Sequence, residues 1–564
     1  MAREPGLSRV RALTAVALLL TLACARAPAT PTKPPAPLVT IVVDQMAAWI
    51  AAERWPTLPP TGGFQRLMRE GTYFRDMRYA HAVTDTAPGH AALYTGNVPR
   101  SNGIFANELV PRGGGAPRSI LEDAETRVVG VDTGETRRPG SSLRALRGAT
   151  LADAFEAQVP GARVFSFSLK DRGALFAAGR APTAALWLDT TLQEMVSSTA
   201  FPAPPRWARD AGGRAAIARA AAGGWALTPD ESAFIAAHAE TPDAQPGEGD
   251  YAGLGVTFPH AIGAAKALRA TPAGDRVLFA LAEDALRATA REGRPSLLAL
   301  SLSSNDYVAH VFGPHSWEAW DELLRLDGAL ADFLTFLDGT FGVDGYAVML
   351  TADHGSAALP ELALAKRDPW CARPAAERAR WQLPCGGPRR RLEQPEIVAA
   401  LERAFTKTLG PGPWLDGLAD PLVFLSSRGR ALTDADRLRA MRAAQAALEP
   451  LGIAQVIDVR SAAAPCAPAG ESLADLVCRS VAPDEPADLY LVVSPGVFFD
   501  AGYPPGFGMS HGSPYLYDRS VPLLVRAPGR FAAGVVRDAP VSFTTFTRTA
   551  AALLGIVPPS DRHD

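Results

Sequence analysis

Short, continuous apolar runs alternate along this chain with longer stretches in which apolar positions follow a helical period. The short runs predict β-strands buried on both faces, and the longer stretches predict amphipathic helices. Expected strands are Val39–Asp44, Arg163–Leu169, Ser296–Ser303, Tyr346–Thr351, Asp488–Val493 and Ser520–Val525. Expected helices are Gly63–Glu70, Ala215–Ala222, Arg276–Arg291, Trp317–Leu337, Gln394–Lys407 and Asp434–Leu451. This alternation predicts an α/β fold in which helices flank a mostly parallel central sheet.

Two stretches depart from the alternation. Residues 182–292 are rich in Ala, Pro and Gly, with only patches of helical pattern, so we expect them to form an inserted cap. Residues 368–391 contain many Arg, Pro and Gly and are expected to be a loop.

The N-terminus has the pattern of an export signal. Three arginines precede the apolar run 12–23, whose length is typical of a signal peptide and short for a membrane span. The run ends in Thr-Leu-Ala before Cys24, which resembles a lipoprotein cleavage site, although Leu is commoner where the Thr stands. We therefore expect a signal peptide over 1–23, a lipidated Cys24 and a Pro-rich tether over 24–37. Cleavage nearby by an ordinary signal peptidase is the alternative.

Composition and charge limit the classes of partner. The chain has 564 residues, of which 47% are hydrophobic and 20% charged, as in a folded protein. The net charge of −3 gives no sign of a surface for nucleic acid or anionic membranes. We expect an exported, periplasmic monomer that acts on small molecules, binds no nucleic acid and touches the membrane only through a lipid anchor at Cys24.

Four further cysteines fall in two close pairs. They are Cys371, Cys385, Cys466 and Cys478. In an exported protein an even number of cysteines indicates disulfides, and four cysteines allow three pairings. We prefer the local pairing, 371 with 385 and 466 with 478, and the alternative is a zinc knuckle.

Six potential metal ligands follow apolar runs or lie in a loop rich in Gly, Ser and Pro. They are Asp44, Asp306, His310, Asp353, His354 and His511. Ligands of open α/β sheets bind at the carboxyl ends of the strands, so these side chains can converge there. Carboxylates and imidazoles suit zinc or a similar divalent ion. A pair of such ions can clamp the attacking and leaving oxygens of a phosphoryl transfer, so the sequence predicts a two-metal site.

Thr86 is the candidate nucleophile. It precedes Ala-Pro-Gly-His and an expected helix, so its hydroxyl faces the positive end of the helix dipole. A bound metal ion would lower the pKa of this hydroxyl and activate it. In isolation Thr86 would be an N-cap; beside the six ligands, we interpret it as the nucleophile.

A set of motifs between Asp44 and about Pro522 resembles the alkaline phosphatase superfamily, in particular the phosphate-irrepressible alkaline phosphatases of the PafA type. The motifs are Val-Val-Asp-Gln-Met, Thr-Ala-Pro-Gly-His, Gly-Ile-Phe-Ala-Asn, Ser-Leu-Lys-Asp-Arg-Gly-Ala, Asp-Tyr-Val-Ala-His, Thr-Ala-Asp-His-Gly and Ser-His-Gly-Ser-Pro. The resemblance implies an alkaline-phosphatase-like catalytic domain over 38–564. It assigns Asp306, His310 and His511 to one zinc ion, and Asp44, Asp353 and His354 to a second. Thr86 would bridge the two, and Ala309 stands where the family has Gly.

The resemblance also implies that Asn107, Lys170 and Arg172 contact the phosphoryl group. Alone, Asn107 would be a loop residue bonded to its own backbone, and Lys-Asp-Arg would be a solvated charge run. We expect Lys170 and Arg172 to point to the same side of an extended segment. Two cations suit the three non-bridging oxygens of a monoester dianion.

These residues predict a zinc-dependent phosphate monoester hydrolase that acts through a phosphothreonine at Thr86. The cap 182–292 would contact the leaving group. The first alternative is a phosphodiesterase or nucleotide pyrophosphatase of the same superfamily, members of which lack the Lys-x-Arg pair. A sulfatase is disfavoured because the chain has no Cys-x-Pro-x-Arg motif. A catalytically silent, tethered binding protein is disfavoured because all six ligands and Thr86 are present. His90 is expected to support the nucleophile turn, and His81 is expected to lie in the core or at the surface.

Overall fold

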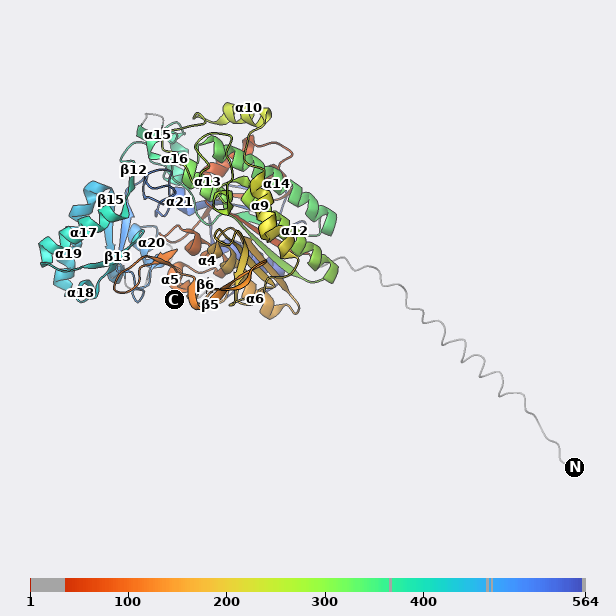
Figure 1. The fold of residues 1–564 in the computed structure, drawn as a ribbon, viewed down its shortest axis with the longest axis horizontal. Coiled ribbons are helices and arrows are strands. Elements are labelled where there is room, and N and C mark those ends of the chain that lie inside the picture. Colours follow the sequence, from red (N-terminus) through yellow and green to blue (C-terminus); the bar gives the residue numbers. More distant parts are fainter. Residues whose placement is uncertain (2–35, 365–367, 463–465, 468–469, 560–564) are drawn as a thin grey trace. The chain divides into compact units, whose positions relative to one another are not determined.

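The computed structural model describes residues 1, 36–364, 368–462, 466–467 and 470–559 (Figure 1). The predicted signal peptide, Cys24 and the tether up to residue 35 lie outside the described residues. Within the part of the chain that is described, no helix is both long and apolar enough to cross a membrane.

A twelve-stranded mixed sheet forms the centre of the fold, in the order β19-β2-β18-β11-β1-β10-β7-β8-β9-β5-β6, with β20 paired to β2. Its middle is parallel: β11 (Ala347–Thr351), β1 (Leu38–Val43), β10 (Ser296–Leu302), β7 (Arg163–Ser168) and β8 (Ala184–Asp189). All six residues of β1 and all seven of β10 are buried, as their continuous apolar sequences predict. The predicted mostly parallel sheet is confirmed.

Antiparallel strands extend the sheet on both sides. On one side are β18 (Ser520–Arg526) and β2 (Thr72–Arg78). On the other are β9 (Glu194–Ser198), β5 (Glu122–Gly130) and β6 (Gly134–Ser141). The short strands β19 (Val535–Arg537) and β20 (Val541–Ser542) pair in parallel with β2.

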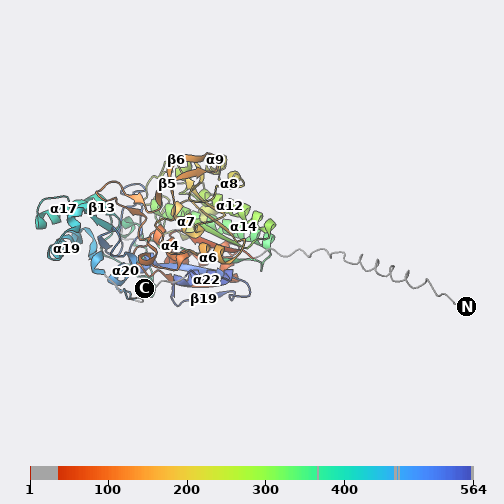
Figure 2. The same ribbon diagram turned by 90° about the horizontal axis from the view of Figure 1, so that it is seen from below.

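Helices cover both faces of this sheet. Figure 2 shows α12 (Pro272–Glu292) and α14 (Trp317–Phe341) on one face, with α6 (Leu151–Gln158) and α22 (Thr544–Leu554) on the other. The predicted helix Gly63–Glu70 is found with the same bounds as α3. One continuous hydrophobic core joins the sheet to these helices.

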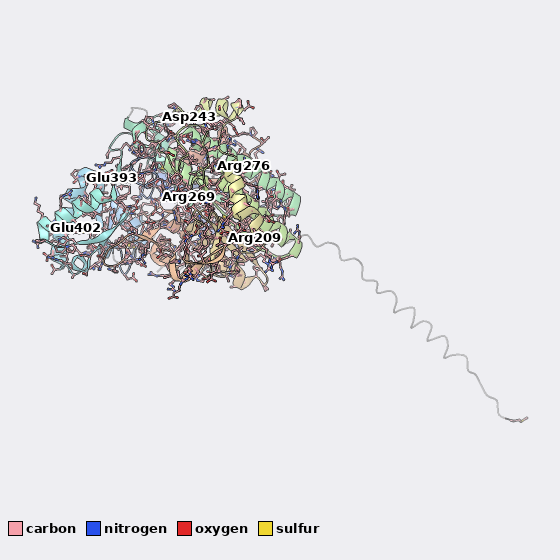
Figure 3. All side chains as sticks on the ribbon, in the orientation of Figure 1. Arg209, Asp243, Arg269, Arg276, Glu393 and Glu402 are labelled. Carbon is pink, nitrogen blue, oxygen red and sulfur yellow. A yellow bond between two sulfur atoms is a disulfide. The ribbon has the colours of Figure 1, made fainter. Side chains whose placement is uncertain are left out.

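A second, four-stranded sheet has the order β13-β14-β16-β15 and is entirely antiparallel. Its strands are β13 (Leu415–Ala419), β14 (Leu422–Leu425), β16 (Leu489–Val493) and β15 (Ile453–Asp458), and α17 (Gln394–Leu409) and α19 (Asp434–Leu448) pack on it. Glu393 and Glu402, labelled in Figure 3, mark this region. The strand predicted at 488–493 therefore belongs to this second sheet and not to the central one.

Two predicted irregular regions contain more regular structure than expected. The loop 368–391 includes α16 (Ala375–Trp381) and leads into β12 (Arg390–Leu392). The stretch 182–292 contributes β8 and β9 to the central sheet and α12 to its cover, because these segments are apolar enough to be buried there. A cap built from the helices between them, α8 (Ala208–Gly212) to α11 (Ala265–Leu268), stays a prediction.

Both cysteine pairs form disulfides. Cys371 is bonded to Cys385 and Cys466 to Cys478, so the local pairing is confirmed and the zinc knuckle is not formed. Disulfides are typical of proteins in oxidising compartments.

Candidate active site

Most of the predicted ligands lie just after three neighbouring strands of the central sheet. Asp44 directly follows β1, and its backbone N–H donates to the carbonyl of Leu302 at 3.0 Å. Asp353 follows β11 after one residue. After β10 the chain turns into α13 (Ser304–Phe312), where Asp306 and His310 lie one helical turn apart on the same face.

The first donor group consists of Asp306, His310 and His511. Asp306 Oδ1 lies 3.2 Å from His310 Nε2 and 3.6 Å from His511 Nε2. Each imidazole Nδ1 lies 2.8 Å from a backbone carbonyl, that of Met509 for His310 and that of Thr84 for His511. A carbonyl accepts only from a protonated Nδ1, so both Nε2 lone pairs are free to bind a cation.

The second donor group consists of Asp44, Asp306 and His354. His354 Nε2 lies 3.4 Å from Asp44 Oδ1 and 3.6 Å from Asp353 Oδ2. Asp353 lies next to these three residues but is not one of them. Its Oδ1 accepts from the backbone N–H groups of Gln45 and His354, at 3.2 and 3.0 Å. All six predicted ligands are therefore brought together, although Asp306 and not Asp353 completes the second cluster.

The residues fit a pair of divalent cations. Asp44 Oδ1, Asp306 Oδ1, Asp353 Oδ2 and His354 Nε2 are buried, and none has a hydrogen-bond partner among the described residues. His90 Nδ1, which lies near Asp353 Oδ2, is bonded to the Thr86 carbonyl instead. Such unsatisfied groups are costly in a protein interior, and these four belong to neighbouring side chains. Oxygen and nitrogen donors of this kind suit zinc or a related metal.

Lys170 joins the donor groups to the candidate nucleophile. Its Nζ lies 2.6 Å from both Asp44 Oδ2 and Asp306 Oδ2, and 3.3 Å from Thr86 Oγ1. Burial alone would lower the pKa of Lys170, but Asp306 and Asp44 raise it above the usual value for lysine. Likewise, burial would raise the pKa of Asp306, but His310 and Lys170 hold it well below the usual value. Lys170 and Asp306 therefore form an ion pair at neutral pH.

Thr86 is the first residue of α4 (Thr86–Thr95), and Asp85 occupies the N-cap position instead. The Thr86 side chain is buried, and its carbonyl accepts from His90 Nδ1 at 2.9 Å. His90 also places Nδ1 3.1 Å from Asp353 Oδ2, so it supports the nucleophile turn as predicted. Gly89 lets α4 approach the metal ligands, since a Cβ there would lie 2.3 Å from the carbonyl oxygen of Asp353.

Asn107 is held against the same helix end. Its Oδ1 accepts from the backbone N–H of Ala87 at 2.9 Å, so it is not a loop residue bonded to its own backbone. Lys170 occupies the N-cap position of α7 (Asp171–Ala178) without a side-chain capping bond, and Arg172 therefore lies in the first helical turn. The expectation of an extended Lys-x-Arg segment was therefore wrong, because the chain enters a helix directly after β7.

A cavity of about 210 Å³ brings these groups together. Thr86, Asn107, Lys170, Arg172, Asp306 and His310 all line it. Sequence reasoning missed other lining residues, among them Glu108, Asp420, Asp500 and Tyr503. Glu108 lies in a two-residue strand directly after Asn107, Asp420 and Asp500 follow short strands, and Tyr503 lies in a loop. None of the four belongs to a motif that marked it. Of the described residues, none within 182–292 lines the cavity, and contact between the cap and the leaving group stays a prediction.

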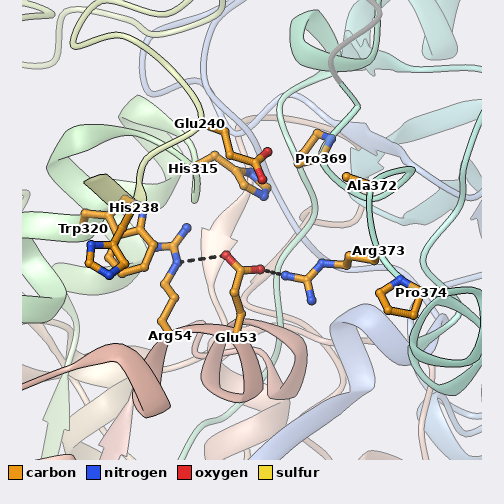
Figure 4. A pocket seen from close by; sticks show the side chains of 10 residues that line it. All are labelled: Glu53, Arg54, His238, Glu240, His315, Trp320, Pro369, Ala372, Arg373 and Pro374. Atoms are coloured by element: carbon orange, nitrogen blue, oxygen red, sulfur yellow. Dashed lines mark ion pairs between the residues drawn. The ribbon is translucent and has the colours of Figure 1, made fainter. Parts of the chain in front are cut away.

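A second cavity, of about 220 Å³, has a different character (Figure 4). Two guanidinium groups, those of Arg54 and Arg373, point at the carboxylate of Glu53 from opposite sides. Its described lining includes no Ser or Thr, and its cations are already paired with carboxylates. It therefore offers no equivalent of the Thr86 site.

A family model and two similar proteins relate this chain to known enzymes. Residues 38–382 match the model of the type I phosphodiesterase / nucleotide pyrophosphatase family. The chain is 33% identical over 334 residues to alkaline phosphatase PhoV of Synechococcus elongatus, covering 57% of this chain and 59% of that protein. It is 32% identical over 336 residues to alkaline phosphatase PafA of Elizabethkingia meningoseptica, covering 57% and 60%. The matched part thus spans about three fifths of each relative's length.

The fold also has a solved counterpart. A crystal structure of an alkaline phosphatase named PafA matches with a TM-score of 0.79 at 24% identity, covering 94% of this chain and 98% of that one. The same phosphatase has been solved with one threonine, one asparagine, one lysine and one arginine replaced. The structural match confirms the predicted alkaline-phosphatase-like fold.

Proposed function

We propose, from the premise that this chain belongs to the type I phosphodiesterase / nucleotide pyrophosphatase family of the alkaline phosphatase superfamily, that it hydrolyses phosphate monoesters with Thr86 as nucleophile. One observation carries the proposal: the Thr86 hydroxyl lines a polar cavity beside Lys170 and both donor groups. The names of the relatives PhoV and PafA support the monoester class.

In this mechanism the Thr86 hydroxyl loses its proton to solvent, and Oγ forms a bond to phosphorus while the bond from phosphorus to the alcohol oxygen breaks. The leaving oxygen takes up a proton from water and departs as the alcohol. Water then cleaves the phosphothreonine and releases phosphate. Two bound zinc ions, held by Asp44, Asp306, His310, Asp353, His354 and His511, would lower the pKa of the Thr86 hydroxyl and offset charge on the leaving oxygen. Most of the acceleration comes from positioning and charge stabilisation, as in other phosphoryl transfers.

Three side chains orient the transferred group. Lys170 and Arg172 provide cations for its non-bridging oxygens, and Asn107 provides amide hydrogens. Asn107 can do so because its Oδ1 is occupied by the Ala87 N–H, which turns Nδ2 outward from that bond. The substitutions made in the solved phosphatase variant concern the same four residue types as Thr86, Asn107, Lys170 and Arg172, which supports this assignment.

A phosphodiesterase is the second candidate, because the family model is named for that activity. The two differ in charge: a monoester is a dianion, whereas a diester carries one negative charge and a second substituent. Two cationic side chains beside Thr86 favour the dianion.

The test compares one phosphate monoester with the matching diester on zinc-loaded protein. Each charge-assisted hydrogen bond contributes roughly 1.5–3 kcal/mol. Since about 1.4 kcal/mol is tenfold in rate, Lys170→Ala with Arg172→Ala should lower monoester kcat/KM by roughly two to four powers of ten. Diester hydrolysis should fall much less. The matched control is Lys407→Ala with Arg537→Ala, which removes two exposed cations outside the cavity. A wild-type preference for the diester, or equal losses for both esters, would replace the monoesterase with the phosphodiesterase.

The export of the protein is a separate proposal. Cys24 would be the lipidated first residue of the mature protein. Cys24→Ser should move the protein from the membrane fraction to the soluble fraction. A soluble wild-type protein whose N-terminus lies downstream of Cys24 would contradict the anchor.

A further inference from the structure

The outer part of the Thr86 cavity is acidic. Glu108 follows Asn107 in β3 (Glu108–Leu109), Asp420 lies in the turn after β13, and Asp500 follows β17 (Val497–Phe499). Glu108 is exposed and the other two carboxylates are partly exposed. By contrast, Thr86 and Lys170 are buried. The cavity therefore runs from the phosphoryl-binding groups at its buried end to carboxylates at its mouth.

These carboxylates are not neutralised by neighbouring cations. Among the described residues, no salt bridge involves Glu108, Asp420 or Asp500. Asp420 Oδ1 accepts a hydrogen bond from Gln394 Nε2 at 3.2 Å, and Asp500 accepts from the backbone N–H groups of Gly502 and Gly506. Burial, with repulsion from Asp85, Glu108 and Asp500, raises the pKa of Asp420 to about 7. The mouth of the cavity thus has an excess of negative charge that a cation would relieve.

The acidic mouth belongs to a cavity and not only to an acidic surface. Asp306, one of the candidate metal ligands, is buried and lines the same cavity, so the mouth and the metal-binding groups share one space. The ring of Tyr503 also lines the cavity, and ring faces attract organic cations. A ligand that spans the cavity would therefore meet cationic groups with its phosphoryl end, and carboxylates and an aromatic ring with its other end.

We propose that the preferred substrates are phosphate monoesters whose leaving alcohol carries a positive charge, such as a quaternary ammonium alcohol, and that Glu108 and Asp420 recognise that charge. The inference rests on the proposed monoesterase function and names its substrate class. Leaving groups that carry additional phosphates would place negative charge against these carboxylates and are disfavoured.

The test uses two esters that differ by one charge: choline phosphate and its neutral isostere, 3,3-dimethylbutyl phosphate. Wild-type protein should favour choline phosphate by about tenfold in kcat/KM, the value of a single screened charge-assisted contact. Glu108→Gln with Asp420→Asn should reduce this ratio to about two, because the polar groups stay and only charge is lost. Asp500 is left intact because its carboxylate also holds the backbone of the loop 500–506. Glu135→Gln, an exposed carboxylate on β6 outside the cavity, should retain the wild-type ratio.

A second measurement needs no variant. Choline should inhibit hydrolysis of the neutral ester more strongly than 3,3-dimethylbutan-1-ol does, and added salt should weaken the difference. A wild-type ratio of one or less, or a ratio that the double variant leaves unchanged, would overturn the inference while leaving the monoesterase intact. Failure to hydrolyse either ester would overturn the proposed function together with the inference.

Discussion

Lys170 offers a measurement of how strongly the buried site depends on a protein cation. Its ammonium lies 2.6 Å from one oxygen of Asp44 and one of Asp306, and all three side chains are buried. Lys170→Met keeps the side-chain volume and removes the charge. Breaking a buried ion pair by removing one partner costs about 3–5 kcal/mol, because the remaining charge is uncompensated. We therefore expect this loss in the free energy of unfolding when a chelator is present.

Zinc should change that result. A bound divalent ion supplies positive charge to the same carboxylates, so the loss from Lys170→Met should fall to about 1 kcal/mol or less in excess zinc. By linkage, the difference of roughly 2–4 kcal/mol appears as about 30- to 1000-fold tighter zinc binding by the variant. Without the lysine, zinc no longer competes with an ammonium group for Asp44 and Asp306.

The assay is urea unfolding at pH 7.5, with and without zinc, together with a zinc-binding titration. The pKa of Lys170 is raised, so its contribution is complete below the unfolded-state pKa and is lost only as pH rises through the higher folded-state pKa. The full effect is therefore present at pH 7.5. Lys407→Met, which removes an exposed cation, is the control and should change stability by under about 0.5 kcal/mol. Equal losses with and without zinc, or no change in zinc affinity, would refute the reasoning.

Three further predictions concern the nucleophile, its helix and a core histidine. Thr86→Ala should lower kcat by several powers of ten while Thr86→Ser retains most activity, since Ser keeps the hydroxyl; phosphate trapped on another residue in acid-quenched protein would contradict this. Gly89→Ala should lower the melting temperature and zinc affinity together, because the new Cβ would lie 2.3 Å from the Asp353 carbonyl oxygen; an unchanged zinc titration would exclude that cause. His81 is buried and has no hydrogen-bond partner within the described ranges, and burial together with Arg519 lowers its pKa to about 3. Its neutral form therefore contributes stability that is present above the unfolded-state pKa near 6.5 and is lost as pH falls towards 3, about 2 kcal/mol by pH 5. His81→Phe should make unfolding less sensitive to acid in this window, and an unchanged pH dependence would contradict the assignment.

The sequence predicted the parts of the site that follow buried strands. Asp44, Asp306 and Asp353 come after runs that can only be interior strands, and parallel strands bring their carboxyl ends to one edge. The prediction that Arg172 lies in an extended segment was wrong, because the sequence pattern does not reveal how soon a strand is followed by a helix. The tight second cluster was also unexpected, since Asp306 and Asp353 have the same chemistry and only the three-dimensional turn after each strand distinguishes them.

The second sheet was largely missed for a different reason. Strand β13 contains Gly417 and an acidic residue, so it gives no continuous apolar run, and β14 is apolar throughout but only four residues long. These strands are stabilised by packing against α17 and α19, which no local pattern records. The acidic mouth of the cavity, supplied partly by Asp420 in the turn that follows β13, was missed for the same reason.

The position of β1 has a consequence for synthesis of the chain. Its two neighbours in the sheet, β10 and β11, begin at Ser296 and Ala347, so Leu38–Val43 has neither partner until more than half of the protein has been made. At about 5–20 residues per second, this strand waits on the order of tens of seconds. Such an unpaired apolar strand is a template for aggregation. A nascent chain that stops before residue 296 therefore carries an open aggregation site, and any factor that protects the emerging protein has to bind near its beginning.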